Sequence, residues 1–318
     1  LNQFFILNFT NTFSFSHIKN PVFYKCYNDN MYFNSINFFC FLIIVLPIFW
    51  ILPKSLKVYW LLFTSYVYYY LASIYYLLIL ILITILTYII GSLINKCKTN
   101  NKNVVILIFG VLSLIFILCF FKYSNNILEL LSSFGLINTS INIPMPTGLS
   151  FYIFSSISYI VDVYKNNNSY ENNIIYLAVY LSYFPKLFEG PIERSKDFIC
   201  QLKNNKKLKS GELYRSLLFI IWGLFLKSVI SDRIAIFVNT IYENIDSVDG
   251  VYLIIATLLY SIQIYCDFYG YTTIAKGVSG LFGIELINNF DCPYFSKSIA
   301  EFWRRWHISL SLWLRDYV

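Results

Sequence analysis

The chain has 318 residues, of which 58% are hydrophobic, 20% are aromatic and only 13% are charged. This composition excludes an ordinary water-soluble protein and predicts a membrane protein. The net charge of +7 does not indicate a nucleic-acid partner, because the basic residues cluster between apolar runs, where the positive-inside rule places them. The seven cysteines are scattered without a CxxC pair and the chain has two histidines, so we expect no disulfide framework and no metal site.

Residues 1–30 come before the first apolar run and are rich in Asn and Phe. They contain no charged segment followed by an apolar segment and a cleavage site, so they do not predict a signal peptide. The sequence from Met31 onward, MYFNSINFFCFLIIVLPIFW, reads as the natural start of a membrane protein. We therefore expect residues 1–30 to be an N-terminal extension outside the core, and residues 31–318 to form the membrane domain.

Continuous apolar runs predict membrane-spanning helices along the rest of the chain. A hydrocarbon core about 30 Å thick requires roughly 20 apolar residues per helix. An outer-membrane β-barrel would instead alternate apolar and polar residues in short segments. We predict an all-α, polytopic bundle with about seven crossings. In chain order, the runs cover residues 38–52, 58–71, 74–94, 104–121, 147–164, 213–230 and 251–266.

A shorter apolar run, residues 174–184, predicts an element that enters the membrane without crossing it. Two loops that carry Lys54, Lys57 and Lys96 fall on one side of the membrane, which the positive-inside rule assigns to the cytoplasm. The lysine cluster that begins at Lys203 falls on the same side only if the run 174–184 does not cross. The run is too short to span the bilayer, so we expect a re-entrant or interfacial element.

Asp162 and Asp267 lie in or beside apolar runs. A carboxylate at the bilayer centre costs about 2.5 to 3.5 kcal/mol, so each one needs a partner or a task. Asp162 is close to the end of its run, and both a structural pairing with a neighbouring cation and a functional role are open. Asp267 follows a long apolar run and precedes a glycine. We treat it as a candidate for function or for support of a functional site.

The segment 300–318, AEFWRRWHISLSLWLRDYV, combines charged residues with three tryptophans and a histidine. Ser298 followed by Glu301 has the capping-box pattern and predicts that a helix starts there. Glu301 and Arg305 are spaced i,i+4 and predict a surface ion pair. Spacings of three and four then predict one apolar helix face that includes His307. The apolar residues of this face are Ile299, Phe302, Trp303, Trp306, Leu310, Trp313 and Leu314.

His307 has two interpretations on this face. In the first, the helix lies at the membrane interface with an aromatic belt, arginines that reach the headgroups, and a histidine bound by a backbone carbonyl. In the second, the imidazole is an acid-base group, because it can accept and return a proton near neutral pH, as acyl transfer to a hydroxyl requires. The residues alone leave both interpretations open.

Five motifs occur in the order GLSFYIFSSISYIVDVYK, YFPKLFEGPIERSKDF, GLFLKSVISDRIA, YSIQIYCDFYGYTTIAKGVSGLFGIEL and NNFDCPYFSKSIAEFWRRWHISLSLWLRDYV. With these motifs the chain resembles the membrane-bound O-acyltransferase family, in particular its bacterial branch of alginate O-acetyltransferase membrane subunits. The resemblance begins weakly at MYFNSINFF and covers residues 31–318. It implies a helix bundle around a tunnel, in which an acyl group is presented from the cytoplasmic side to an extracytoplasmic hydroxyl.

The resemblance implies that His307, the histidine of the WHIS motif, belongs to the active site as a general base or as a hydrogen-bonding partner of the acceptor hydroxyl. Asp267, Arg304 and Arg305 match positions of the family motifs, and we expect them to support the tunnel structurally or electrostatically. Family members continue beyond the RDYV position into helices with a second active-site histidine, whereas no histidine follows His307 here. We therefore expect this chain to be an incomplete, C-terminally truncated piece that is inactive alone.

The favoured function is transfer of an acetyl group to hydroxyls of a cell-surface or exported polysaccharide, by a multi-pass enzyme of the cell membrane. We expect no bound cofactor, because the acyl donor, acetyl-CoA or an acyl-carrier thioester, is a substrate. The expected partners are the lipid bilayer and either the polysaccharide or an extracytoplasmic protein that relays the acyl group. Two alternatives remain open: D-alanyl transfer to teichoic acid within the family, and a membrane transporter or channel outside it.

Overall fold

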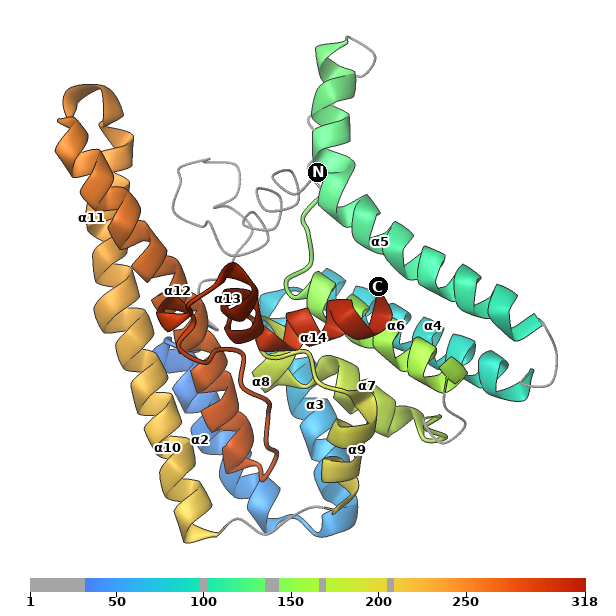
Figure 1. Ribbon diagram of the computed structural model, residues 1–318. Coiled ribbons are helices and arrows are strands. Elements are labelled where there is room, and N and C mark those ends of the chain that lie inside the picture. Colours follow the sequence, from blue (N-terminus) through green and yellow to red (C-terminus); the bar gives the residue numbers. More distant parts are fainter. Residues whose placement is uncertain (1–31, 98–101, 135–142, 166–169, 205–208) are drawn as a thin grey trace.

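The computed structural model describes residues 32–97, 102–134, 143–165, 170–204 and 209–318, and within these ranges it contains no strand (Figure 1). The expected extension, residues 1–30, lies outside the described residues. In chain order, the elements are α2 (Ile36–Ile51), α3 (Lys54–Ala72), α4 (Ile74–Lys96), α5 (Lys102–Ser133), α6 (Leu149–Lys165), α7 (Ile174–Ser182), α8 (Phe184–Leu187), α9 (Ser195–Asn204), α10 (Ser210–Leu224), the π-helical segment η2 (Phe225–Ser231), α11 (Asp232–Glu243), the 3₁₀ turn η3 (Ile245–Ser247), α12 (Gly250–Leu281), the 3₁₀ turn η4 (Pro293–Phe295), α13 (Ile299–Arg305) and α14 (Ile308–Tyr317).

The predicted apolar runs correspond to these helices, and the prediction of an all-α, polytopic fold is confirmed. Each run lies inside one helical stretch or extends at most two residues beyond it. By length and composition, the described stretches that can cross a membrane are Ile74–Lys96, Asn103–Ser133, Ser210–Glu243 and Gly250–Leu281. The other three predicted crossings correspond to α2, α3 and α6, which have 16, 19 and 17 residues.

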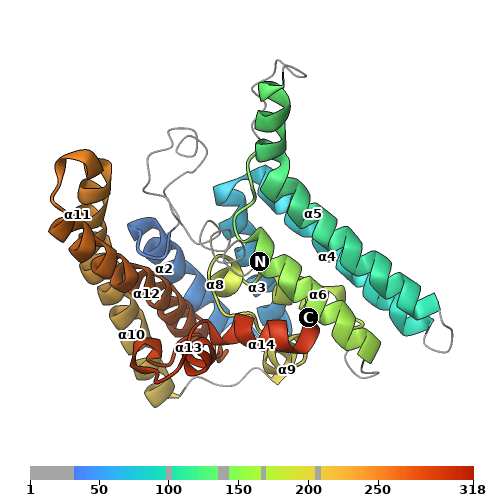
Figure 2. The same cartoon turned by 45° about the horizontal axis from the view of Figure 1, so that its top comes forward.

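The long helices form two groups on opposite sides of the molecule (Figure 1, Figure 2). In one group, α10, η2 and α11 run beside α12, and in the other, α6 packs on α4 and α5. Helices α2 and α3 and the short helices α7 to α9 lie between the groups. Helix α14 packs on α6. Trp313 helps to fix this contact, because its indole N–H donates to the Phe154 carbonyl at 3.0 Å.

Helices α10 and α12 pack closely because glycines face their contact. A Cβ atom on Gly223 would lie 2.6 Å from Ile274 Cγ1 and 2.7 Å from the Gly270 carbonyl oxygen. A Cβ atom on Gly277 would lie 2.7 Å from the Ser216 carbonyl oxygen. Small residues let two helix backbones approach in this way in membrane proteins. The contact therefore aligns α12 along α10.

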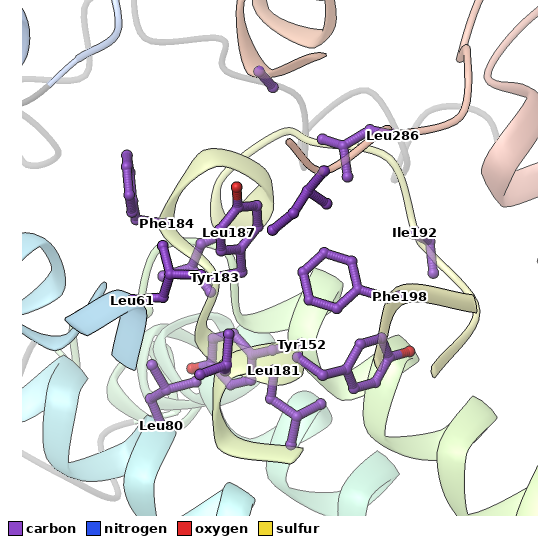
Figure 3. Close-up of a cluster of buried hydrophobic side chains, with 14 of the residues drawn as sticks. Leu61, Leu80, Tyr152, Leu181, Tyr183, Phe184, Leu187, Ile192, Phe198 and Leu286 are labelled. Atoms are coloured by element: carbon purple, nitrogen blue, oxygen red, sulfur yellow. The ribbon is translucent and has the colours of Figure 1, made fainter. Parts of the chain in front are cut away.

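The short apolar run forms α7, which ends inside the protein. Its nine residues rise only about 14 Å, too little to cross the hydrocarbon core. Figure 3 shows Tyr183, Phe184 and Phe198, which follow α7 in the chain, among the apolar side chains that meet at the centre. The hydroxyl groups of Tyr183 and Ser279 lie 3.2 Å apart. This contact joins the centre of the molecule to α12.

Replacement of Gly277 by alanine should destabilise the protein, because the new methyl group would collide with the Ser216 carbonyl and force α10 and α12 apart. Overpacking of this kind costs about 1 to 3 kcal/mol. We expect a lower melting temperature in detergent and less protein in the membrane. The matched control is Gly250→Ala on the same helix, where a Cβ atom meets no atom within 4 Å. Equal melting temperatures of the two variants would argue against the close contact.

Candidate active site

His307 lies in a break between α13 and α14. The predicted helix start is confirmed, since Ser298 Oγ accepts the Glu301 N–H at 3.1 Å. The prediction of one continuous helix through His307 is wrong, because α13 ends at Arg305. The next residue, Trp306, is extended with φ −97° and ψ 127°. His307 then adopts the left-handed conformation, with φ 44° and ψ 57°.

Asn289 explains the break. Its backbone carbonyl accepts the Ile308 N–H at 2.9 Å, and its side-chain Oδ1 accepts the Ser309 N–H at 3.3 Å. The Asp291 N–H donates to the Arg305 carbonyl at 3.0 Å. These bonds take the place of helical ones at the junction. They offset the left-handed backbone, which costs roughly 1 to 2 kcal/mol for a residue other than glycine.

The break also overturns the predicted apolar face. The prediction puts Trp303 and Leu314 on one face with His307, but these two side chains are 48% and 42% exposed, whereas His307 is 5% exposed. Leu310 and Trp313 of α14 are buried. The left-handed residue changes the direction of the chain, so α13 and α14 do not share a face. His307 is buried as a result, while Trp303 lies at the surface.

The His307 imidazole is buried against aromatic rings. It meets the Phe268 ring of α12 edge to face, with centroids 4.8 Å apart and planes at 90°. Phe290 packs on Phe268 and on Trp306, in each case with centroids 5.0 Å apart. Burial lowers the pKa of His307 to about 3, because desolvation penalises the charged form. The imidazole is therefore neutral at physiological pH, and in this form one ring nitrogen can donate a hydrogen bond and the other can accept one.

Asp267 directly precedes Phe268 on α12, and the structure pairs it with a residue that the sequence analysis missed. Lys227 Nζ lies 2.5 Å from Asp267 Oδ1 and 2.9 Å from Asp232 Oδ1. Lys227 belongs to the π-helical segment η2, and π-helical turns occur frequently at functional sites. A single lysine inside a predicted apolar run is the sequence feature that could have identified it.

The structure places the two predicted arginines on the outer side of α13. Arg304 is exposed, and Arg305 Nη2 lies 2.7 Å from Glu301 Oε1 in the predicted i,i+4 ion pair. Ion pairs at this exposure contribute at most about 1 kcal/mol. Of the four predicted site residues, His307 contacts Phe268, which directly follows Asp267 on α12, whereas the arginines lie toward the surface.

Asp162 has a structural partner, which is a hydroxyl group and not the expected cation. The Tyr317 hydroxyl donates to Asp162 Oδ1 at 2.8 Å. Beside it, Arg194 forms an ion pair with Asp316, and Lys165 Nζ donates to the Asp316 carbonyl at 3.1 Å. This network fastens the end of α14 to α6 and to the loop before α9. It favours the structural alternative for Asp162.

The described residues do not bring three His, Cys, Asp or Glu side chains together as metal ligands. A cavity of about 10 Å³ is lined by residues that include Tyr152, Ser155, Lys186 and Pro191. A volume of this size holds about one water molecule. This cavity is therefore too small for an acyl group, and the candidate site stays at His307.

Known proteins match most of the chain. The sequence profile of the membrane-bound O-acyltransferase family matches residues 64–318. The "probable alginate O-acetylase AlgI" of Pseudomonas aeruginosa is 34% identical over 291 residues, covering 90% of this chain and 56% of that protein. The peptidoglycan O-acetyltransferase of Helicobacter pylori is 31% identical over 289 residues, covering 81% and 54%. The teichoic acid D-alanyltransferase of Bacillus subtilis is 33% identical over 177 residues, covering 54% and 44%. The chain spans about half the length of these relatives.

Replacement of Lys227 by methionine should destabilise the protein, because Asp267 and Asp232 would lose the positive charge between them. Removal of one partner from a buried ion pair costs about 3 to 5 kcal/mol, and partial exposure of the two carboxylates places the expected loss at the lower end. The melting temperature in detergent is the measurement. Lys203→Met is the control, since that lysine pairs with Glu171 but its side chain is 48% exposed. Similar melting temperatures for both variants would refute the importance of Lys227.

The buried neutral imidazole predicts a loss of stability in acid. The folded pKa of His307, about 3, lies below its ordinary value of 6.5, so below pH 6.5 the unfolded state binds a proton that the folded state does not. Stability is therefore lost as the pH falls from 6.5 toward 3. Between about pH 7 and about pH 5 the melting temperature should fall less in His307→Asn, which does not titrate and tolerates a left-handed backbone. The same pH dependence in both proteins would rule out this contribution.

Proposed function

This chain belongs to the membrane-bound O-acyltransferase family and is a multi-pass membrane protein, and we propose that the whole protein is an O-acetyltransferase of the cell membrane that esterifies hydroxyls of a cell-surface or exported polysaccharide. Two relatives, named for O-acetylation of alginate and of peptidoglycan, match 90% and 81% of the chain and support this proposal. The D-alanyltransferase matches 54%, so D-alanyl transfer to teichoic acid is the second candidate. Family membership argues against a transporter or channel.

The observation that carries the proposal is the neutral, buried imidazole of His307. A neutral imidazole can take a proton from a hydroxyl group, whereas an imidazolium cannot. The Phe268 ring covers one side of it, with Phe290 packed behind Phe268, and electrostatic interactions are stronger in such apolar surroundings than in water. A positioned acid-base group accelerates a reaction by roughly 10² to 10⁴. We assign His307 the role of general base.

In the proposed reaction, the acceptor hydroxyl gives its proton to His307 as its oxygen attacks the carbonyl carbon of the donor thioester. The new C–O bond replaces the C–S bond, and the leaving thiolate takes the proton from the imidazolium. The products are an ester and a free thiol, and His307 is neutral again. The donor, acetyl-CoA or an acyl-carrier thioester, is a substrate, so the reaction needs no bound cofactor. The acceptor is the polysaccharide itself or an extracytoplasmic protein that relays the acetyl group to it.

In this proposal, the other predicted site residues act indirectly and do not contact the reacting groups. Asp267 supports the site through α12. Its ion pair with Lys227 fixes this part of the helix, and the next residue, Phe268, contacts the imidazole. Arg304 and Arg305 add positive charge at the surface of α13, where they attract anionic groups of lipids or of an acyl donor.

Substitution of His307 by alanine, or by asparagine to suit the left-handed backbone, should abolish ester formation by the whole protein without lowering its level in the membrane. The substitution removes the proposed base, and we expect a loss of about 10²-fold or more. Acetyl esters on the polysaccharide of a strain that carries the variant are the measurement. His17→Ala, which changes the other histidine of this chain, is the matched control and should retain activity.

Each result of this experiment has a clear meaning. Unchanged acetyl ester formation in the His307 variants would show that the imidazole is a packing group. Loss of alanyl esters in place of acetyl esters would favour the second candidate function. Loss of activity in His17→Ala to the same extent would show that the effect is not specific to the buried imidazole.

A further inference from the structure

We infer that Asn289 is a positioning residue for His307, because its side-chain carbonyl caps α14 and so sets the left-handed turn that buries the imidazole. The inference rests on the role proposed for His307, and it adds to that role a residue outside the WHIS motif. Three features of the structure support it: the cap, the backbone bond beside the cap, and the rigid setting of Asn289 itself.

Helix α14 takes its N-terminal cap from a distant residue. The residue at the cap position is His307, whose side chain makes no cap hydrogen bond. Ser, Thr, Asn and Asp are the side chains that usually accept from the first N–H groups of a helix. Asn289 supplies such a side chain from 20 residues before Ser309, whose N–H it accepts. The helix end therefore does not need the imidazole, which lies against Phe268 instead.

The backbone of Asn289 adds a second bond at the same place. Its carbonyl accepts the Ile308 N–H at 2.9 Å. The first N–H groups of a helix have no partner within the helix and must find one elsewhere. Asn289 satisfies two consecutive groups, those of Ile308 and Ser309. Together the two bonds fix the first turn of α14 relative to Asn289, and with it the residue immediately before that turn, His307.

Asn289 is buried, and the residues on both sides of it in the chain are fixed by buried contacts. It is 3% exposed. Two residues earlier, the Ile287 N–H donates to the Glu193 carboxylate at 2.7 Å, and Glu193 is also buried. One residue later, Phe290 packs against Phe268. A positioning residue requires such a rigid setting, because a mobile one would not hold the group that it contacts.

The two polar atoms of the Asn289 side chain allow two roles to be separated by substitution. Oδ1 accepts from α14, whereas Nδ2 is buried and has no hydrogen-bond partner among the described residues. Aspartate keeps an acceptor for the cap and removes the Nδ2–H donor. Leucine has the same branched shape and number of heavy atoms but somewhat more bulk, and it removes both. A role in positioning requires only the acceptor, and a direct contact with substrate would require the donor.

The test compares Asn289→Asp and Asn289→Leu with the wild-type whole protein in its membrane. The matched control is Asn288→Leu, because Asn288 is the adjacent residue of the same type but its Oδ1 contacts Lys276 in exposed surroundings. The first readout is the acetyl ester content of the polysaccharide. The second is the rate at which diethyl pyrocarbonate modifies His307, measured by mass spectrometry of the peptide that contains it. The second readout does not depend on enzymatic activity.

We expect Asn289→Leu to lower ester formation roughly 10- to 100-fold, since a displacement of about 1 Å can cost this much. The same variant should speed the modification of His307, because the imidazole leaves its buried position. Asn289→Asp should retain far more of both readouts than Asn289→Leu, because its carboxylate still caps α14, although the buried charge lowers the stability of the variant. Asn288→Leu should match wild type in both.

Other outcomes overturn the inference or the proposed function separately. Unchanged esters and unchanged modification in Asn289→Leu would overturn the inference. An inactive Asn289→Asp with His307 still protected would also overturn it, and would point to the Nδ2–H donor. If Asn289→Leu exposes His307 but His307→Ala still forms esters, the positioning role stands and the proposed base fails. If Asn289→Leu does not accumulate, Asn289→Ala removes the cap without added bulk and is judged by the same two readouts.

Discussion

The hydrogen bonds between residues 289–291 and residues 305–309 are the constraint on which the candidate site depends. They interrupt a segment whose apolar spacing would otherwise continue as one helix. A continuous helix would put the imidazole on the same face as Trp303, which is 48% exposed. The interruption instead buries His307 against α12. The buried, neutral state of the imidazole, and any acid-base role, follow from this change of direction.

The apolar surroundings of the chain also determine how it accommodates its few charges. Burial of an unpaired ion is costly, so a charged side chain in such surroundings either pairs or becomes neutral. Asp267 and Asp232 share the ammonium group of Lys227, whereas burial keeps the His307 imidazole in its neutral form. The second solution leaves the imidazole able to accept a proton, and its lowered pKa favours the return of that proton to a stronger base, such as a leaving thiolate, although it weakens the imidazole as a base toward the hydroxyl.

The helices could be predicted from the sequence because an apolar segment in lipid must satisfy its backbone hydrogen bonds internally. The break at His307 could not, since no Gly or Pro marks it and the apolar spacing continues across it. Its cause is Asn289, whose contact with α14 exists only in the folded chain. The importance of His307 was predicted from the family resemblance and not from the residue itself. Lys227 was open to prediction as a charge in an apolar run, but its two carboxylate partners required the fold.

The charge concentrated in segment 300–318 has a structural explanation. Glu301 and Arg305 pair within α13, and Asp316 near the end of α14 pairs with Arg194. Each helix thus carries its ion pair on the outer side, where a single pair contributes little to stability. The Arg194–Asp316 pair also restricts the orientation of α14, because Arg194 lies outside that helix, whereas the Glu301–Arg305 pair stays within α13. Within this fully described segment, His307 is the titratable side chain that is buried, so the charged side chains lie toward the surface while the imidazole remains in the interior.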